Sequence, residues 1–318
     1  MVLRMNHARR AIWVKYCGAL LMTAVFIILW MPGASLSATA EQRTFAAPEE
    51  AVKALVEALK SNDFKALEAI FGPEGEDLIS SGDPVADQFI RERFVKEFEE
   101  KNSLERTDEE AVLVIGNEDW PFPIPIVKTD SLWRFDTEEG RQEMLARRIG
   151  KAEWSAIQVC LAYVDAQREY ALKDRDADAL LEYAQKFRSD PGKKNGLYWE
   201  TKEGEEPSPL GPFAAAAQKE GYDLKGENPI PYHGYYYRIL KGQGESAQGG
   251  AYDYLVNGKM IGGFAMVAYP AKYGASGIMT FIVNHEGVVY QKDLGENTEE
   301  TAQVMALFNP DGTWKKAE

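Results

Sequence analysis

The residues best suited to acid/base chemistry in this chain are His233 and His285. Imidazole titrates near neutral pH, so two imidazoles in one cleft could exchange protons or hold a metal ion. With Asp253 as a nearby carboxylate, the pair gives a hydrolase-like enzyme as one hypothesis. The alternative is structural, because His233 stands at the start of a predicted strand and residues 284–287, Asn-His-Glu-Gly, have the composition of a hairpin turn.

A second candidate site is the alternating series Asp174, Asp176 and Asp178. Calcium-binding loops place oxygen ligands at alternate positions in this way. The match is partial, because the sixth position holds Ala179 instead of glycine and the twelfth holds Gln185 instead of glutamate. We therefore expect a solvated helix break capped by Asp178 and no cofactor. The alternative is that this series binds calcium.

Cys160 is the single cysteine after residue 40, so no internal disulfide can form in the mature chain. Its neighbours Val159 and Leu161 indicate a buried small hydrophobe instead of a nucleophile. The sequence contains no Gly-x-Ser-x-Gly, His-Glu-x-x-His, phosphate-loop or dinucleotide-binding glycine pattern. These observations favour a non-catalytic protein over an enzyme.

Tyrosines are concentrated in the second half of the chain. Tyrosine combines an apolar ring with a polar tip, which suits ligand-binding and protein-binding surfaces. Side chains alternate between the faces of a strand, so three consecutive tyrosines must place a ring on each face. Core packing takes some of these rings, and any exposed remainder would form a binding surface. The candidates are Tyr232, Tyr235, Tyr236, Tyr237 and Tyr252.

Residues 1–40 have the features of a signal peptide. An apolar run at 17–30 is short for a membrane span, and Ala38-Thr39-Ala40 resembles a signal-peptidase site. We expect cleavage near Ala40 and a periplasmic or secreted protein. The alternative is an uncleaved anchor, since a helix extended to Met31 could cross a thin bilayer if tilted. The basic residues before the apolar run are Arg4, Arg9, Arg10 and Lys15.

The mature chain is strongly acidic. Residues 1–40 carry four basic and no acidic residues, so their removal takes the formal net charge from −14 to −18. Binding to phosphate backbones and to anionic lipid surfaces depends on lysine and arginine. The charge therefore excludes nucleic acid as an expected partner, and leaves membrane contact only through an uncleaved signal segment.

The elements that must position these residues begin with helices. Pro48, followed by two glutamates, has the pattern of a helix start. The order of helices and then strands resembles the cone-shaped nuclear-transport-factor-two-like domains over residues 45–137, which implies a curved antiparallel sheet. The sequence predicts helices at 48–59, 63–71 and 85–101, and strands at 111–115, 124–127 and 132–135.

The second part of the chain is predicted to contain a long joining helix and an antiparallel sheet with a packed helix. The apolar stripe of the long helix spans 141–164 and continues, after a break, through Leu180, Ala184 and Phe187. Residues 190–231 suggest a functional loop or a mobile cover containing a helix at 213–219. Strands follow from Tyr232 to Tyr290, with a flexible connection at 242–250, a tight turn at Asn257-Gly258 and a closing helix at 298–308.

These elements predict an α+β protein. We expect the chain to divide into a signal peptide at 1–40, a helix-first α+β domain at 41–137, and the long helix with its antiparallel-sheet domain at 138–318.

Several motifs, in order along the chain, resemble the bacterial exported family known as domain of unknown function 2950. They lie at 45–52 (Phe-Ala-Ala-Pro-Glu-Glu-Ala-Val), 75–84, 119–125 (Asp-Trp-Pro-Phe-Pro-Ile-Pro), 232–236 and 284–290. The resemblance implies an envelope or secreted protein and supplies no catalytic residues. Members tend to have glycines where this chain has Ala177 and Ala179. We expect a non-catalytic binding or assembly module that presents the aromatic sheet to a protein or small-molecule partner in the envelope.

Overall fold

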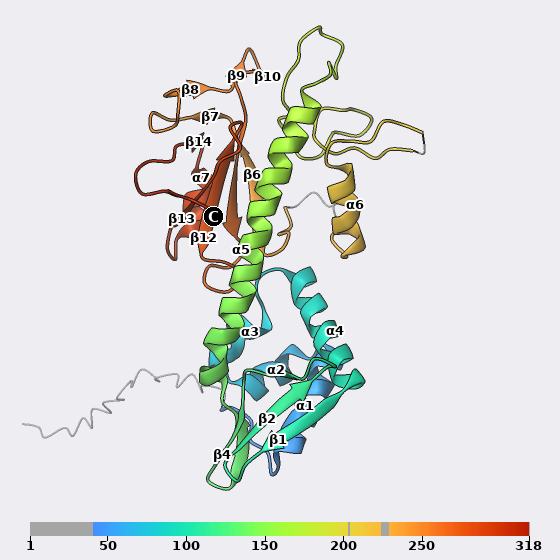
Figure 1. Cartoon of the computed structure of the whole chain (residues 1–318), viewed down its shortest axis with the longest axis vertical. Coiled ribbons are helices and arrows are strands. Elements are labelled where there is room, and N and C mark those ends of the chain that lie inside the picture. Colours follow the sequence, from blue (N-terminus) through green and yellow to red (C-terminus); the bar gives the residue numbers. More distant parts are fainter. Residues whose placement is uncertain (1–40, 203, 224–228, 318) are drawn as a thin grey trace, which may run out of the picture. The chain divides into compact units, whose positions relative to one another are not determined.

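The predicted N-terminal helices are present in the computed structural model, which describes residues 41–202, 204–223 and 229–317 (Figure 1). The predicted signal peptide lies outside these residues. Within them, no helix is both long enough and apolar enough to cross a bilayer. The N-terminal helices are α1 (Pro48–Ser61), α2 (Phe64–Phe71), the 3-10 turn η1 (Pro73–Gly75), α3 (Glu76–Ile79) and α4 (Pro84–Glu100).

Local sequence explains where these helices begin. Pro48 and Pro84 occupy first-turn positions, where the missing N–H costs nothing. The carboxylate of Asp63 accepts a hydrogen bond from the amide of Ala66 at 3.0 Å, which caps α2. Asp83 caps α4 in the same way.

The N-terminal helices pack on an antiparallel sheet. Its main path is β1-β2-β4-β5, and β3 pairs with β2. The first strand was not predicted, because its residues are mostly exposed and polar and so show no apolar alternation. Trp133, Phe135 and Ile126 point from the sheet into a core shared with α1 and α2. The strands are β1 (Asn102–Arg106), β2 (Glu110–Ile115), β3 (Trp120–Pro121), β4 (Ile126–Thr129) and β5 (Leu132–Phe135).

A 34-residue helix, α5 (Thr137–Tyr170), follows the sheet and is green in Figure 1. Leu145 belongs to the N-terminal core, whereas the side chains from Ala152 to Tyr170 that point inward belong to a second core. The expected continuation of the helix through Leu180 and Phe187 is wrong, because α5 ends at Tyr170 and residues 171–199 form turns and extended segments. Ala184 and Phe187 still reach the second core, but from non-helical backbone.

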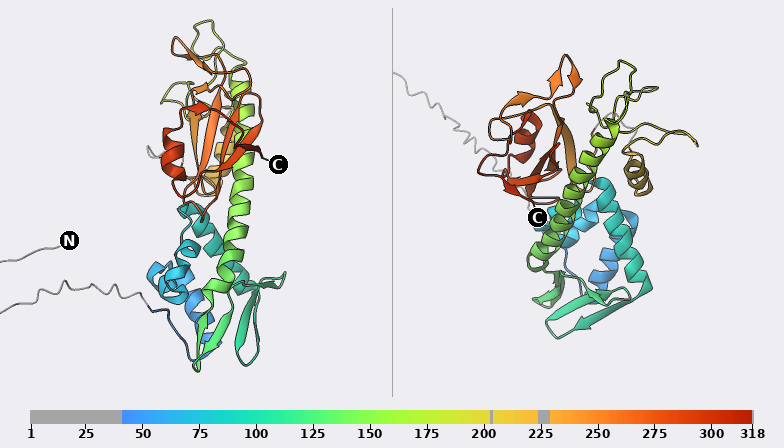
Figure 2. Two further views of the ribbon diagram at one scale, coloured as in Figure 1. Left: turned by 90° about the vertical axis from the view of Figure 1, so that its left-hand side faces the viewer. Right: turned by 45° about the horizontal axis from the view of Figure 1, so that its top comes forward.

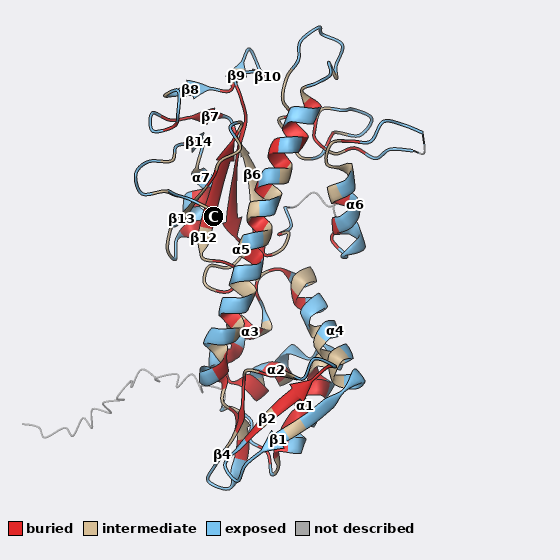
Figure 3. Cartoon of the chain, viewed as in Figure 1, coloured by how far each residue is buried: buried red, intermediate tan, exposed pale blue. Residues whose placement is uncertain are grey.

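The C-terminal sheet has five strands in the order β15-β13-β12-β11-β6, and each neighbouring pair is antiparallel. Helix α5 packs on one face of it, mainly against β12, and α7 packs over β11 (Figure 2). The inward-facing side of α5 and the central strands are buried (Figure 3). The strands are β6 (Tyr235–Leu240), β11 (Ala265–Pro270), β12 (Met279–Asn284), β13 (Val289–Asp293) and β15 (Lys315–Lys316), and the helix is α7 (Thr298–Val304).

Two predicted boundaries differ in this region. The closing helix ends at Val304 instead of 308, because residues 307–308 form a strand that pairs in parallel with β7. The connection at 242–250, predicted to be flexible, begins with that same strand β7. The short strands are β7 (Gly242–Gln243), β8 (Tyr252–Asp253), β9 (Leu255–Val256), β10 (Lys259–Met260) and β14 (Leu307–Phe308).

The tight turn is confirmed. Asn257 and Gly258 have φ of 51° and 81° and join β9 to β10, as expected for a two-residue hairpin turn that needs positive φ at both positions. Together, the helices and open antiparallel sheets confirm the α+β class. The described residues form two hydrophobic cores, one on each sheet, and α5 contributes to both.

Candidate functional site

An apolar pocket of about 450 Å³ lies beside the first strand of the C-terminal sheet. Its floor includes Tyr237 on β6, and one wall is α5 with Val159 and Ala162. The opposite wall is helix α6 (Gly211–Lys219), which contributes Ala214 and Ala217. The volume falls within the range of about 300 to 1,000 Å³ that is common for ligand-binding pockets.

Small side chains create the hollow. Ala214 and Ala217 are three residues apart and so lie on one face of α6, where both are almost fully buried. Alanine side chains fill less of the space between two helices than leucine side chains would. Aromatic rings surround the space that is left. These rings belong to Tyr163, Phe187, Tyr198, Phe213, Tyr232 and Tyr236, in addition to Tyr237.

The wall formed by α6 is fixed at both ends. At its start, the amide of Leu210 donates to the carbonyl of Leu197 at 2.9 Å. Near its end, Glu220 lies 3.1 Å from Nε2 of His233. In between, the rings of Phe213 and Tyr232 meet edge to face at 5.1 Å. The helix predicted at 213–219 is therefore present, begins two residues earlier at Gly211, and is tethered beside the sheet.

The hydroxyl groups of two core tyrosines in the pocket are already used within the protein. Tyr163 donates to the carbonyl of Ala265 at 3.2 Å and accepts from Gln167 at 3.0 Å. Tyr237 donates to the carbonyl of Tyr232 at 3.3 Å. Burial raises the pKa of Tyr237 and of Tyr163, so both rings stay uncharged. The lining is mostly apolar and aromatic, with Arg188 and Asp223 as its charged members, so the pocket is suited to an apolar group.

The structure brings together three of the five tyrosines proposed from the sequence. Tyr232, Tyr236 and Tyr237 line the pocket. Tyr235 is fully buried instead, and its hydroxyl donates to the carbonyl of Met279 at 2.9 Å. Tyr252 lies on β8, half exposed and packed against Tyr254. Tyr235 therefore lies in the core, and Tyr252 lies on a separate small sheet.

The two histidines lie at opposite ends of β11. That strand pairs Pro270 with Tyr235 at one end and Ala265 with Asn284 at the other. His233 precedes Tyr235, and His285 follows Asn284. A six-residue strand separates its ends by about 17 Å, so the imidazoles cannot reach one reacting atom. Among the described residues, Asp253 forms no hydrogen bond or ion pair with either ring, and the two-histidine site of the hydrolase-like hypothesis is not formed.

Each histidine has a structural environment of its own. His233 has a φ of 52° and, with Gly234, forms the turn that leads into β6. Its backbone amide donates to the hydroxyl of Tyr222 at 3.2 Å. The ring of His285 packs edge to face against Tyr254 and Phe264 at 5.8 and 6.2 Å. Both therefore act as turn residues packed against aromatic rings.

These environments predict a pH dependence of stability. Burial lowers the pKa of His285, and it also lowers the pKa of His233, although Glu220 opposes that shift. The unfolded chain then binds more protons than the native chain near and below pH 6.5, so the free energy of unfolding should fall as the pH falls from 7 to 5. Urea unfolding of residues 41–318 at pH 7, 6 and 5 measures this, and His285→Phe should reduce the slope. Equal stability at pH 7 and 5 would contradict the prediction.

The aspartate series forms a compact surface loop. Carboxylate oxygens of Asp174, Asp176 and Asp178 lie within 4.8 Å of one another. The ammonium group of Lys259 occupies the same place, with ion pairs to Asp176, to Asp178 at 2.7 Å and to Glu182 at 3.2 Å. This contact lowers the pKa of Asp178. A lysine therefore supplies the positive charge that a calcium ion would bring.

The prediction that Asp178 caps a helix is wrong. Its carboxylate accepts from the amide of Leu180 at 3.0 Å, but no helix begins at this position. Asp174 holds the loop, accepting hydrogen bonds from the amides of Ala177 and Ala179, both at 2.8 Å. The loop is thus a set of turns closed by aspartate side chains.

Calcium is expected to leave the stability of this loop unchanged, because the ammonium group of Lys259 already pairs with two of the three aspartates. A cation that binds only the native state must raise the melting temperature. The measurement is a thermal melt of residues 41–318 in millimolar CaCl₂ and in chelator. A higher melting temperature with calcium would establish binding and contradict this expectation.

The same loop contains strained alanines. Ala177 and Ala179 have φ of 62° and 69°, in the left-handed region that favours glycine. The left-handed conformation costs a non-glycine residue about 1 to 2 kcal/mol. We expect Ala177→Gly and Ala179→Gly each to raise the free energy of unfolding by about 0.5 to 1 kcal/mol, since glycine also loses more entropy on folding. Urea unfolding would show this.

Ala215→Gly is the matched control for that pair. Ala215 is exposed on α6 in ordinary helical backbone, where glycine is expected to lower stability by about 1 kcal/mol. Destabilisation by all three substitutions would show that the two loop alanines are not strained.

Cys160 is fully buried on α5. Burial raises the pKa of its thiol, which keeps the sulfur protonated and unreactive. The structure therefore places this residue in the core between α5 and the sheet, as its neighbours in the sequence indicated.

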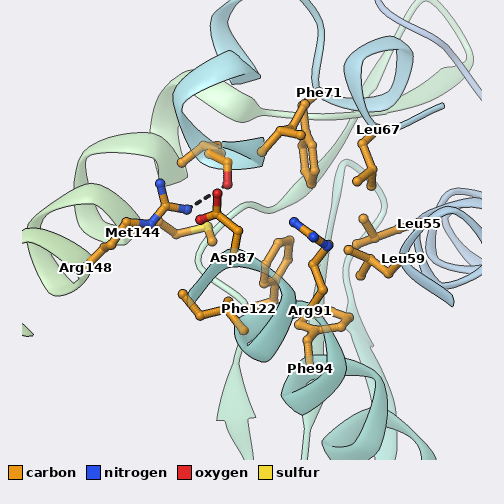
Figure 4. A pocket seen from close by; sticks show the side chains of 13 residues that line it. Leu55, Leu59, Leu67, Phe71, Asp87, Arg91, Phe94, Phe122, Met144 and Arg148 are labelled. Atoms are coloured by element: carbon orange, nitrogen blue, oxygen red, sulfur yellow. Dashed lines mark hydrogen bonds between the residues drawn. The ribbon is translucent and has the colours of Figure 1, made fainter. Parts of the chain in front are cut away.

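A smaller cavity of about 70 Å³ lies in the N-terminal core and is lined by apolar side chains of α1, α2 and α4 (Figure 4). Its charged neighbours have partners within the protein. Asp87 accepts from Ser81, at 2.9 Å from the amide and 2.7 Å from the hydroxyl. Arg148 donates to the carbonyl of Leu78 at 2.7 Å, and Arg91 donates to Asn62 at 3.1 Å. The cavity is below the usual size of a ligand site, and we regard the aromatic pocket as the better candidate.

Sequence reasoning missed the pocket walls. Val159 and Ala162 look like ordinary core positions of α5, and Ala214 and Ala217 look like helix-forming residues. The available signal was the alanine-rich helix preceding a tyrosine-rich strand, which indicates a face with little side-chain bulk opposite large rings. That pattern is also compatible with close helix packing, so only the structure identifies a hollow.

A scan against protein families matches residues 42–317 to the family described as "Protein of unknown function (DUF2950)". Searches of curated proteins and of solved structures find no match to this chain.

Proposed function

The chain belongs to this family of proteins of unknown function, and we propose that it is a non-catalytic binding module of the bacterial envelope whose aromatic pocket receives an apolar part of a partner. The observation that carries the proposal is the 450 Å³ space between α5, α6 and β6, surrounded by aromatic rings and alanines. Burying one medium-sized apolar side chain there would contribute about 1.5 to 3 kcal/mol to binding.

The predicted export of the protein supports the proposed role in the envelope. The predicted signal peptide at 1–40 and the formal charge of −18 for the remaining chain fit a secreted or periplasmic protein that avoids nucleic acid and anionic surfaces. The mass of the protein purified from the bacterial envelope tests this point. A mass corresponding to Glu41 at the N-terminus supports cleavage, and a retained N-terminus identifies an anchor.

The pocket itself is tested with Nile red, an uncharged apolar dye that the acidic surface does not repel. Residues 41–318 should bind the dye with a rise in fluorescence. Ala214→Phe places a ring in the hollow and should weaken binding at least about tenfold, because the dye loses the apolar burial that the pocket supplies.

Ala215→Phe is the control, since Ala215 lies on the same helix but is exposed. It should bind the dye as the unmodified protein does, and circular dichroism would confirm that both variants are folded. Equal dye binding by Ala214→Phe and Ala215→Phe would show that the dye does not occupy the pocket, and would remove the basis of the proposal.

A further inference from the structure

The strand that forms the pocket floor, β6, is at an edge of its sheet. The amide of Ala271 donates to the carbonyl of Gly234 at 2.9 Å, and the amide of His285 donates to the carbonyl of Phe264 at 3.0 Å. In an antiparallel pair, hydrogen-bonded residue pairs alternate with pairs that are not hydrogen-bonded. In the observed register, these two bonds show that the residues of β6 that bond with β11 are every second one, beginning with Tyr236. The backbone groups of Tyr235, Tyr237 and Ile239 must therefore point away from β11.

The outward edge is hydrogen-bonded at its two ends. Tyr235 exchanges backbone hydrogen bonds with Tyr232, at 2.8 and 3.2 Å. At the other end, the carbonyl of Lys241 accepts from the amide of Tyr254 at 2.9 Å. Between these ends, the outward N–H and C=O groups of Tyr237 and Ile239 form no hydrogen bond with any described residue.

Two prolines explain why residues 229–231 do not continue the hairpin with β6. In a continued hairpin, Ile230 would lie opposite Tyr237, since Tyr232 lies opposite Tyr235. Pro229 and Pro231 flank Ile230, and proline fixes φ near −65°, away from the extended values of an antiparallel strand. The arm before Tyr232 leaves the edge, and Ile230 lines the pocket instead.

We propose that an extended peptide segment of a partner protein adds to β6 as an antiparallel strand opposite Tyr237 and Ile239, and places the apolar side chain opposite Tyr237 in the aromatic pocket. This inference rests on the proposed function of the pocket and specifies its partner. Main-chain bonds to an exposed edge supply affinity in this mode of recognition, and pockets for alternate side chains supply specificity.

The geometry limits the partner. Opposed residues of two paired strands point to the same face, and Tyr237 lines the pocket between α5 and α6. The residue opposite Tyr237 would thus point into it. The residue opposite Ile239 would lie on the same face of the sheet, and the residue between them would point away. Because the edge is used at both ends, the paired stretch is short, about three to five residues. The charge of −18 favours a segment with neutral or basic flanks.

A labelled pentapeptide, Lys-Val-Thr-Val-Lys, is a suitable probe, with binding followed by fluorescence anisotropy. An ester oxygen in place of either valine N–H removes a hydrogen bond to β6, and should weaken binding about fivefold. The same change at the threonine N–H, which points away from β6, should have less than about a twofold effect. Equal losses at valine and threonine would overturn strand addition.

The protein offers a second test. Ile239→Pro removes an N–H that β11 does not use, and proline is tolerated at sheet edges. This variant should bind the pentapeptide at least about fivefold more weakly while binding Nile red normally. Normal peptide binding by Ile239→Pro would refute strand addition, and the proposed function would stand if Ala214→Phe still abolishes dye binding. Absence of dye binding by the unmodified protein would refute the proposed function itself.

A second copy of this chain is the competing occupant of the edge. Sedimentation of residues 41–318 should show a monomer that binds the pentapeptide. A dimer that Ile239→Pro dissociates and that the pentapeptide competes away would assign the edge to self-association, and would overturn the proposal of a partner segment.

Discussion

Replacing Asp83 with alanine is expected to lower the free energy of unfolding of residues 41–318 by about 3 to 5 kcal/mol, a large part of the stability of a typical domain. Asp83 is fully buried. One carboxylate oxygen accepts from the amides of Val85 and Ala86, at 3.2 and 3.1 Å, and so caps α4. The other accepts from the hydroxyl of Tyr222 at 3.0 Å and from the amide of Gly234 at 2.8 Å.

The expected loss is large because alanine would leave these donors without an acceptor. An unpaired buried donor costs about 1 to 3 kcal/mol, and loss of a helix cap costs about 1 kcal/mol more. Tyr222 and Gly234 adjoin the turn that leads into β6, so the substitution should also loosen the approach to the aromatic pocket.

Asp63→Ala is the control. Asp63 also caps a helix, but it is exposed and accepts one amide hydrogen bond, from Ala66. Its removal should cost about 1 kcal/mol. Urea unfolding of both variants gives the comparison, and equal losses would show that the bonds from Asp83 to Tyr222 and Gly234 contribute nothing.

Gly140→Ala should destabilise the protein by about 3 kcal/mol, although alanine normally favours helices. Gly140 lies in the first turns of α5, where a Cβ atom would come within 2.5 Å of the carbonyl oxygen of Pro123 and 2.7 Å of Cα of Ile124. Both atoms belong to the backbone, so neither can move aside by a change of rotamer.

Gly150 lies on the same helix and provides the opposite expectation. A Cβ atom there would meet nothing within 4 Å. Gly150→Ala should therefore stabilise the protein by about 1 kcal/mol, the usual gain of helix propensity. Thermal or urea unfolding of the two variants should give changes of opposite sign. A gain in stability from Gly140→Ala would mean that α5 does not approach residues 123–124 this closely.

Local signals allowed much of the fold to be predicted. Pro48 marks a helix start because proline fits the first turn, and Asn257-Gly258 marks a hairpin because the turn needs positive φ. The errors occurred where tertiary contacts override local preference. Residues 171–199 contain helix-compatible apolar spacing, but the side chain of Gln167 bonds both the amide and the carbonyl of Ala184 at 2.8 Å and holds this segment in an extended form.

The candidate site was predictable only in part. The tyrosine-rich strand identified the region, and alternation correctly required that Tyr235 and Tyr236 face opposite sides. Which ring reaches the pocket depends on where α5 and α6 lie, and no local pattern encodes that. The open edge of β6 depends on strand order and on register, which are set by pairing between residues far apart in the sequence.

Helix α5 also limits how the chain can be divided. Leu145 completes the N-terminal core, and Ala156 and Tyr163 complete the C-terminal one. A fragment ending before Thr137 would lack the wall that covers its own core, and a fragment beginning there would carry the exposed apolar side chain of Leu145. The two cores are therefore poor units for separate expression or for exchange between proteins, because one continuous helix is a structural part of each.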